Sequence, residues 1–314
     1  DENTLNAVYT PSQAEIDAGN LTLTLTTTGN GNCIAVSDEM NITITPAPVV
    51  SAGSDQTVCA NNSDVDLNGN ITVATGGTWT GGNGTFAPDA NALGATYTPS
   101  AGEILAGSVS LTLTSTGNGN CVPESDVMNI TITPAPTAEA GPDQEVCSNN
   151  ADITLGGSVT NATGGAWSGG LGSFAPNPNN LNAVYSPTQS EINSGSITLT
   201  LTTTGIGNCI AVTDSLTITF SPSPTADAGV NQTVCANNEA VQLNGAVTIA
   251  TGGTWTGGSG TFTPDANSLD AVYNPAQSEI DAGTVTLTLT TTGNGDCNPE
   301  SDEMTITITP APVV

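Results

Sequence analysis

The sequence predicts an all-β protein made of tandem β-sandwich domains, and three observations lead to this fold class. The chain repeats with a fixed period of 88 residues, which Cys33, Cys121, Cys209 and Cys297 mark. Apolar and polar residues alternate in the longest segments, as in strands with one buried face. Each repeat holds about seven such short segments, separated by glycine-rich turns. A fixed period is typical of one folding unit repeated in series, and not of a single large catalytic domain.

Further regularities place the repeat boundaries. The same spacing separates a second series of cysteines and one tryptophan per copy: Cys59, Cys147, Cys235, Trp79, Trp167 and Trp255. Paired prolines, which stiffen the chain and disfavour strand pairing, recur at 46–48, 134–136, 222–224 and 310–312. We therefore expect the C-terminal half of a repeat at 1–48 and β-sandwich repeats at 49–136, 137–224 and 225–314. Because residue 1 aligns with residue 89, we expect this chain to be part of a longer polypeptide.

The order of the strands can be followed in one copy. Short β-forming segments lie at 56–58, 65–67, 76–82, 84–86, 95–97, 109–114 and 128–133. The segment Val-Ser-Leu-Thr-Leu-Thr at 109–114 alternates, so its leucines should face a core and its threonines the solvent. Gly-Asn-Gly-Asn at 117–120 provides the turn before the last strand. Seven short strands without a long helix favour a sandwich of immunoglobulin-like type.

Composition excludes several classes of function. The chain has 29 acidic residues, no Lys, Arg or His, and a formal charge of −29. Phosphate backbones need cations opposite them, so we exclude nucleic-acid binding. An anionic membrane surface would repel the chain, and no apolar run is long enough for insertion. Without a His or Lys base or an Arg, we expect no enzyme and no cofactor.

The seven cysteines indicate an oxidising, extracellular environment. Each complete repeat has one cysteine before Asn-Asn and another, 62 residues later, after Gly-Asn or Gly-Asp. We expect disulfides within the repeats, namely Cys59–Cys121, Cys147–Cys209 and Cys235–Cys297, with the partner of Cys33 upstream of residue 1. The rival pairing joins neighbouring repeats 26 residues apart, as in Cys33–Cys59. A zinc site would need His or a Cys-x-x-Cys pair, and the chain has neither.

A glutamate recurs at one position of every copy, where a short helical turn should begin. Ser or Thr stands three residues before it in three copies, which is the spacing of a capping box. The expected capping residues are Ser12 with Glu15, Ser100 with Glu103, and Thr188 with Glu191. The fourth copy has Ala276 before Glu279, so its cap should be incomplete.

Carboxylates are the only hard metal ligands that this chain offers, and calcium prefers them. An Asp recurs five residues after the second cysteine, at Asp38, Asp126, Asp214 and Asp302. In a hairpin such an Asp most often bonds its own backbone. The metal-binding alternative brings Glu103, Asp143 and Asp214 together as a calcium site at a junction between repeats. No Asp-x-Asp-x-Asp loop supports that site, and Asn231 replaces Asp143 in the next copy.

The tryptophans lie on a short strand between glycine pairs, one per repeat, and we expect them in the core. The alternative is a set of aromatic platforms for sugars.

Several motifs of the second complete repeat resemble those of a known family. They are Ala140-Gly-Pro-Asp-Gln-Glu-Val-Cys147-Ser-Asn-Asn, Leu155-Gly-Gly, Leu199-Thr-Leu-Thr-Thr-Thr-Gly and Leu216-Thr-Ile-Thr. With them the chain resembles, over essentially its whole length, the PKD-like repeats of very large surface proteins of gliding Bacteroidota, including SprB-type adhesins. The resemblance implies a cell-surface adhesin or filament exported by the type IX secretion system. It implies no catalytic residues.

We therefore expect a non-catalytic stalk on a bacterial cell surface, used in gliding motility or surface attachment, with the other repeats of the same long chain as its partners. The alternative is that the repeats themselves bind surface polysaccharide or neighbouring chains of an extracellular filament. A carboxylate hydrolase is a third hypothesis. A surface cluster of aromatic residues in one copy would favour the second hypothesis, and a cleft with paired carboxylates the third.

Overall fold

Segments in which Thr alternates with Leu or Ile form the longest strands. The computed structural model describes residues 2–313. In the first complete repeat, β10 (Ser108–Thr116) pairs antiparallel with β11 (Ser125–Thr133), and Leu111 lies opposite Met128. Both side chains are buried. The residues that alternate with the buried ones along β10 and β11 are exposed or half-buried. The period of two in the sequence thus becomes the two faces of a sheet.

Each complete repeat consists of two packed layers of strands. In the first, β4 (Gln56–Cys59) pairs parallel with β11, and β7 (Gly76–Thr80) pairs antiparallel with β10, giving the sheet order β4-β11-β10-β7. The second layer holds the pair β3 (Val49–Ser51) and β6 (Asn70–Thr72), and the sheet β5 (Val65–Asp66), β9 (Thr96–Thr98) and β8 (Thr85–Ala87). These layers form an immunoglobulin-like β-sandwich, as the sequence predicts. The short strands β3 and β6 were not expected from the sequence.

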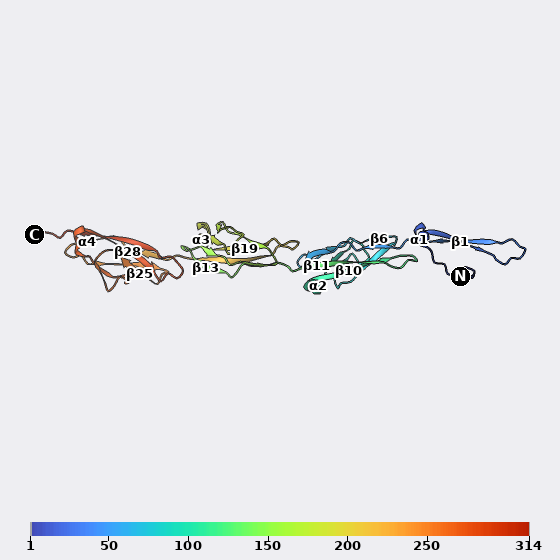
Figure 1. Cartoon of the computed structure of the whole chain (residues 1–314). Helices are drawn as coiled ribbons and strands as arrows, with labels where there is room; N and C mark the ends of the chain where they lie inside the picture. Colours follow the sequence, from blue (N-terminus) through green and yellow to red (C-terminus); the bar gives the residue numbers. More distant parts are fainter. Residues whose placement is uncertain (1, 314) are drawn as a thin grey trace. The chain divides into compact units, whose positions relative to one another are not determined.

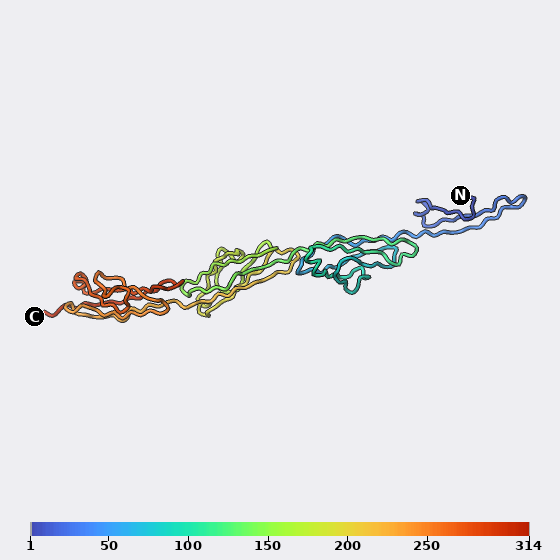
Figure 2. The backbone as a smooth tube through the Cα atoms, turned by 90° about the horizontal axis from the view of Figure 1, so that it is seen from below, coloured from blue at the N-terminus to red at the C-terminus, as the bar shows by residue number. Residues whose placement is uncertain are grey.

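The next two repeats have the same sheets. The second contains β12 (Thr137–Glu139), β13 (Gln144–Cys147), β14 (Ile153–Thr154), β15 (Ser158–Thr160), β16 (Gly164–Ser168), β17 (Ser173–Ala175), β18 (Val184–Ser186), α3 (Gln189–Ser194), β19 (Ser196–Thr204) and β20 (Thr213–Ser221). The third contains β21 (Thr225–Asp227), β22 (Gln232–Cys235), β23 (Val241–Gln242), β24 (Ala246–Thr248), β25 (Gly252–Thr256), β26 (Thr261–Thr263), β27 (Val272–Asn274), α4 (Gln277–Ala282), β28 (Thr284–Thr292) and β29 (Ser301–Thr309). Figure 1 labels β25, β28 and α4 of the third repeat, and Figure 2 traces its backbone in orange and red.

Every complete repeat has its own hydrophobic core, drawn from residues of that repeat alone. The tryptophans lie in these cores, as expected, and are at most 3% exposed. In the first repeat the Trp79 ring nitrogen donates a hydrogen bond to the backbone oxygen of Leu93 at 3.3 Å. The tryptophan rings are therefore not available as sugar platforms.

A six-residue helix follows β9 and its equivalents. In the first repeat it is α2 (Ala101–Ala106), and it ends at Gly107, whose φ of 78° is the left-handed conformation that glycine adopts without strain. The helix leads directly into β10, one of the two inner strands of the four-stranded sheet.

Residues 2–48 form a smaller element of α1 (Gln13–Ala18), β1 (Asn20–Thr26) and β2 (Ser37–Thr43), with β1 and β2 paired antiparallel. Leu25 and Met40 are 60% and 56% exposed there, whereas their equivalents Leu113 and Met128 are buried. By compactness the chain divides into two units, and Gly207–Ile210 of the second repeat belongs to the unit that otherwise ends at Ala135.

Candidate functional site

The most specific constellation in the structure involves two recurring segments. The first is the asparagine loop, Cys-x-Asn-Asn, at 59–62, 147–150 and 235–238. The second is the cysteine hairpin, at 29–34, 117–122, 205–210 and 293–298, which joins the two long strands of each copy. We call the contact of an asparagine loop with a cysteine hairpin a joint. Residues 2–313 contain two joints, and each links one repeat with the next.

The asparagine loop has a fixed shape at the end of the sheet. Cys59 is the last residue of β4, where it lies beside Thr133, the last residue of β11. The Asn62 N–H donates to the Cys59 backbone oxygen at 2.9 Å, which closes a tight turn. The loops at Cys147 and Cys235 make the same bond, at 3.0 and 2.8 Å.

Each joint is closed by a disulfide. Cys59 bonds Cys209, and Cys147 bonds Cys297, each across 150 residues of sequence. The first cysteine of one repeat thus bonds the second cysteine of the following repeat. The two closed loops overlap, since Cys147 lies between Cys59 and Cys209.

The pairing predicted from the sequence is therefore wrong: the structure has none of Cys59–Cys121, Cys147–Cys209 and Cys235–Cys297. The strand topology gives the reason. Cys59 lies beside the end of β11, whereas Cys121 lies before the start of that nine-residue strand. The strand separates the two cysteines by about 26 Å, and a disulfide requires Cα atoms within about 7 Å. The rival Cys33–Cys59 pairing is also absent, because Cys33 is free.

Asparagine side chains hold the first joint beside its disulfide. Asn61 pairs with the backbone of Ile210 twice, donating to its oxygen at 2.9 Å and accepting from its N–H at 3.0 Å. Asn62 donates to the backbone oxygen of Asn208 at 3.2 Å, and Asn208 donates to the backbone oxygen of Thr57 at 3.0 Å. The asparagine side chains of the loop thus hydrogen-bond backbone groups of the hairpin, as the backbone of a paired strand would.

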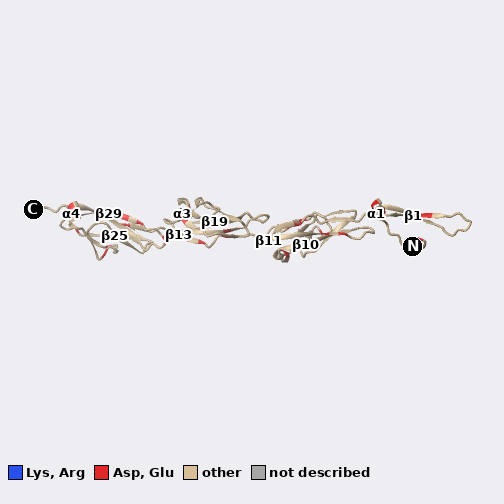
Figure 3. Cartoon of the chain, viewed as in Figure 1, with Lys and Arg blue, Asp and Glu red and all other residues tan. Residues whose placement is uncertain are grey.

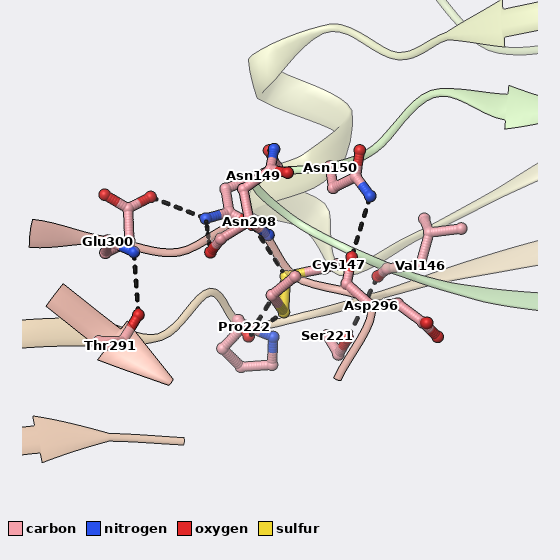
Figure 4. Close-up of a disulfide and its surroundings, with 11 residues drawn as sticks. Val146, Cys147, Asn149, Asn150, Ser221, Pro222, Thr291, Asp296, Asn298 and Glu300 are labelled. Atoms are coloured by element: carbon pink, nitrogen blue, oxygen red, sulfur yellow. Dashed lines mark hydrogen bonds between the residues drawn. A yellow bond between two sulfur atoms is a disulfide. The ribbon is translucent and has the colours of Figure 1, made fainter. Parts of the chain in front are cut away.

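The second joint has the same asparagine pairing and two further hydrogen bonds (Figure 4). Asn149 donates to the Asn298 backbone oxygen at 3.1 Å and accepts from its N–H at 3.1 Å. Asn150 donates to the Asp296 backbone oxygen at 2.9 Å. The Asn149 amide also donates to the Glu300 carboxylate at 2.7 Å, a bond that the first joint lacks. The Asn298 side chain donates to the Asn149 backbone oxygen at 2.7 Å as well. The bond from Asn208 to Thr57 in the first joint has no counterpart, because Asp296 stands in place of Asn208 and its carboxylate cannot donate.

One backbone carbonyl faces both sulfurs of each joint. Pro134 places its oxygen 3.9 Å from the sulfurs of Cys59 and Cys209. Pro222 does the same for Cys147 and Cys297, also at 3.9 Å. These prolines begin the Pro-x-Pro motifs, so the motif that marks the repeat boundary also contacts the disulfide across it.

The joint residues Asn61, Asn62, Asn149 and Asn150 were missed by sequence reasoning. The signal was present, because Asn-Asn follows the first cysteine in all three complete repeats. A turn of small polar residues is the ordinary interpretation of such a pair. The contact of these asparagines with the hairpin of the next repeat could be found only from the structure, because it depends on where that hairpin lies.

The expected capping residues form a second recurring constellation, in which a glutamate, buried in the three complete repeats, is held without any cation. In the second repeat, Glu191 accepts hydrogen bonds from the backbone and hydroxyl of Thr188 at 2.7 and 2.8 Å. It also accepts from the Tyr185 hydroxyl at 2.7 Å and from the Leu171 N–H at 2.6 Å. Ser100 with Glu103 makes the corresponding capping bonds, and so does Ser12 from its backbone and hydroxyl to Glu15.

These hydrogen bonds set the ionisation of the cluster. Burial by itself raises the pKa of Glu191, but the bonds from Thr188, Leu171 and Tyr185 outweigh it and lower the pKa to about 2. Burial, followed by the hydrogen bond to the carboxylate, raises the pKa of Tyr185 to about 12. Glu191 is therefore a charged structural link between a helix start and a neighbouring turn, and not a general acid.

The structure does not assemble the calcium site that the sequence suggested. Asp214 accepts from the Ala140 N–H at 2.7 Å, and Asp143 accepts from the Thr217 N–H at 2.7 Å. Glu103 is used in its own capping cluster. Across residues 2–313, no group of three or more Cys, Asp or Glu side chains is close enough to hold a metal ion.

The recurring Asp after each second cysteine has a different role from the expected one. Asp126 accepts from the Ala52 N–H at 2.8 Å, and Asp302 accepts from the Ala228 N–H at 2.8 Å. In the complete repeats these carboxylates therefore tie the last strand to the chain entering the repeat, 74 residues earlier. Figure 3 shows the acidic residues along the chain, with no basic residue beside them.

Comparison with known proteins finds no family for this chain and several solved structures of low similarity. No family model and no curated protein matches this chain. Among solved structures, it is similar to the I-band fragment I67–I69 of titin at 12% identity and a TM-score of 0.43, covering 85% of this chain and all of that one. It is also similar to mouse cadherin-23 EC22–24, at 13% identity and a TM-score of 0.35, with 84% and 99% covered. A third similar structure is Sidekick-1 immunoglobulin domains 1–5, at 12% identity and a TM-score of 0.32, with 91% and 66% covered.

Proposed function

We propose that this chain is a non-catalytic structural segment of a bacterial cell-surface adhesin or filament. It acts as a stalk that transmits force between a surface and a distal binding part. The observation that carries the proposal is the pair of overlapping disulfides, each of which closes a joint between consecutive repeats.

The overlap of the disulfides suits a chain under tension. Between the two disulfides run three parallel chain segments, namely 59–147, 147–209 and 209–297. A pulling force is shared by these segments, and the shortest of them limits how far the chain can extend. A repeat that unfolds therefore releases little length, and its neighbours hold it in place for refolding.

The disulfides also support an extracellular location, because structural disulfides persist in oxidising compartments and are rare in the cytosol. Within the described residues, no helix is long and apolar enough to cross a membrane.

The finer parts of the proposal are a bacterial surface, export by the type IX secretion system, and a use in gliding motility or attachment. What supports them is the resemblance of the recurring motifs to PKD-like repeats of SprB-type adhesins.

One observation favours the alternative that a repeat itself binds a neighbouring chain. Leu105 at the end of α2 is 90% exposed beside a shallow groove lined by Ile104, Ile132 and Pro134. The equivalent positions in the next two copies are Asn193 and Asp281, so those copies lack the exposed leucine.

A replacement experiment in the source bacterium separates the two functions. Residues 49–224 are exchanged for an unrelated tandem of immunoglobulin-like domains of equal length, and surface attachment is measured with immunogold labelling of intact cells. A stalk predicts that attachment is retained, whereas simple deletion of the same residues weakens it. If the unrelated tandem fails although it is displayed, the repeats themselves bind. If labelling needs lysed cells, the surface location is wrong.

A further inference from the structure

The cysteine hairpins differ in one residue that has chemistry of its own. Three of the four contain an Asn-Gly pair, at Asn30, Asn118 and Asn294, whereas the hairpin of the first joint has Ile206 before its glycine. We propose that these three Asn-Gly pairs are sites of spontaneous deamidation, and that the modification of Asn294 loosens the second joint. This modification goes beyond the stalk function and does not depend on it.

Deamidation of an Asn-Gly pair needs no enzyme and no oxidant. The backbone nitrogen of the glycine attacks the side-chain Cγ of the asparagine, and the bond from Cγ to Nδ2 breaks. Nδ2 leaves as ammonia with the hydrogen of the glycine N–H, and a cyclic imide remains. Water then opens the imide at either carbonyl carbon, which gives aspartate or isoaspartate. Glycine favours the attack because it has no side chain beside the attacking nitrogen, and asparagine is among the thermolabile residues.

The chain has six Asn-Gly pairs, and the glycine N–H divides them into two sets. Outside the hairpins, at Asn68, Asn83 and Asn244, this N–H donates a hydrogen bond that must break before the nitrogen can attack. The acceptors are the backbone oxygen of Leu93 at 3.0 Å, the Tyr97 hydroxyl at 2.9 Å and the backbone oxygen of Leu269 at 2.9 Å, in that order.

In the hairpins the attacking nitrogen is free. Within residues 2–313, the N–H groups of Gly31, Gly119 and Gly295 make no hydrogen bond. In the first complete repeat the turn is closed by the Cys121 N–H, which donates to the Asn118 oxygen at 3.0 Å. Gly119 follows Asn118 inside this turn, with a φ of 61°, and its own N–H takes no part in the closure.

The asparagine side chains of two hairpins are held by few bonds. Nδ2 of Asn118 donates to the Ser115 oxygen, and Nδ2 of Asn294 donates to the Thr291 oxygen, each at 3.2 Å. Within the described residues, Oδ1 of both asparagines is buried and has no hydrogen-bond partner. A buried oxygen without a partner costs free energy. The fold therefore holds these amides weakly, and their Cγ can turn towards the glycine nitrogen.

One pair of sites separates the effect of the fold from that of the local sequence. Asn83 and Asn118 both lie in the tripeptide Gly-Asn-Gly. The Asn83 side chain is exposed and that of Asn118 is half-buried. Exposure alone would make Asn83 the more reactive residue, whereas the state of the glycine N–H makes Asn118 the more reactive one.

Modification of Asn294 removes two hydrogen bonds that shape the hairpin of the second joint. The Asn294 oxygen accepts the Cys297 N–H at 3.2 Å and so closes the turn that ends at the disulfide. In isoaspartate the main chain runs through Cβ and Cγ, and this oxygen becomes part of a free carboxylate. In both products Nδ2 is lost, and a carboxylate replaces the donor that bonds the Thr291 oxygen. The first joint is spared, because Ile206 has no amide.

The sites are tested by ageing the folded, oxidised chain at mildly alkaline pH. Digestion with pepsin in acid stops the reaction and needs no Lys or Arg, and mass spectrometry then follows each asparagine. Asn30, Asn118 and Asn294 should convert, and Asn83 should convert about tenfold more slowly, as a hydrogen bond of ordinary strength on Gly84 would impose. In the reduced chain in urea, Asn83 and Asn118 should convert at equal rates. If Asn118 and Asn294 convert no faster than Asn83 in the folded chain, the proposal is wrong.

The loosening of the second joint is tested by the rate at which a thiol reductant opens each disulfide. In the aged wild type, Cys147–Cys297 should be reduced faster than in fresh protein, whereas Cys59–Cys209 should be reduced at its original rate. Asn294→Ile, which copies the hairpin of the first joint, should show no effect of ageing. Equal acceleration of both disulfides, or acceleration in aged Asn294→Ile, would overturn the role of Asn294.

Discussion

At the level of single residues, neutral hydrogen-bond donors stabilise the buried carboxylates, a role that cationic side chains have in most proteins. Glu191 is 6% exposed, and a buried carboxylate needs hydrogen bonds that satisfy its charge. Backbone N–H groups, a hydroxyl and a tyrosine provide them here, since the chain has no Lys, Arg or His. Glu103 and Glu279 are buried in the same way in the neighbouring repeats.

The low pKa of Glu191 makes its contribution to stability depend on pH. In the unfolded chain the pKa is near 4.5, and in the fold it is about 2. At pH values between these two pKa values the unfolded chain binds more protons than the folded chain. The free energy of unfolding therefore falls as the pH is lowered through this range. Glu191→Gln should therefore be less stable than the wild type at neutral pH, and the difference should shrink towards pH 2. Urea unfolding followed by circular dichroism measures it.

Glu139→Gln is the matched control for this prediction, because Glu139 is exposed on β12. Its difference from the wild type should stay small at every pH. A constant difference for Glu191→Gln between pH 7 and pH 2 would show that the carboxylate is not held in its charged form by the fold.

Residue patterns predicted these local roles well. The three-residue spacing of Ser or Thr before Glu identified the capping pairs, because a capping box depends only on neighbours in sequence. The tyrosine and the second turn that complete the cluster were not predicted. Tyr185 and Leu171 reach Glu191 only after the sandwich has folded, and no local spacing encodes that contact.

At the level of elements, the short helices α1 to α4 of the described residues differ in one capping hydroxyl. The helix α4 begins after Ala276. From this residue Glu279 accepts a hydrogen bond from the backbone N–H alone, because alanine has no hydroxyl. The helix α2 begins after Ser100, whose hydroxyl also donates to Glu103 at 2.8 Å.

Restoring the hydroxyl should stabilise the third repeat. Ala276 has the extended N-cap backbone of the other copies, with φ of −74° and ψ of 158°, so serine fits without strain. Ala276→Ser should raise the free energy of unfolding by about 0.5 to 1 kcal/mol. The reverse change, Ser100→Ala, should lower it by a similar amount. Denaturant unfolding of both variants checks the pair, and an unchanged midpoint for both would contradict the capping role.

Strands and helices could be predicted from the sequence, but the partner of each cysteine could not. The alternation of Thr and Leu predicts which face of a strand is buried. It does not predict which strand ends lie next to each other in the fold. The parallel pairing of β4 with β11 places Cys59 at the end of the sheet opposite the Cys121 hairpin. That pairing depends on the whole topology, so a spacing of 62 residues suggested a bond that the fold forbids.

At the level of the whole molecule, a charge of −29 without any cation must be balanced by ions from solution. Residues 2–313 contain no group of three or more acidic or cysteine side chains close enough to hold a metal ion, and we expect calcium to act by screening alone. Thermal melting in calcium and in sodium chloride at matched ionic strength should give the same curve. A calcium-specific shift that saturates would reveal a site, and loss of that shift in Asp214→Asn would place it.

Two overlapping disulfides link consecutive repeats and should limit the extension of the chain. This limit can be measured on single molecules that are held by their two ends and unfolded completely by force. The oxidised chain can extend only through its first 59 residues, the segment 147–209 and the residues after 297, which gives a length of about 480 Å at about 3.5 Å per residue. The reduced chain should reach about 1,100 Å on the same scale.

Substitution of the free cysteines makes this measurement specific for the pairing. Cys121→Ser and Cys235→Ser should leave the oxidised length unchanged, because neither residue takes part in a disulfide. Pairing within repeats would instead lengthen each of these variants by about 220 Å. An unchanged length is the result that the overlapping disulfides predict, and that lengthening would contradict them.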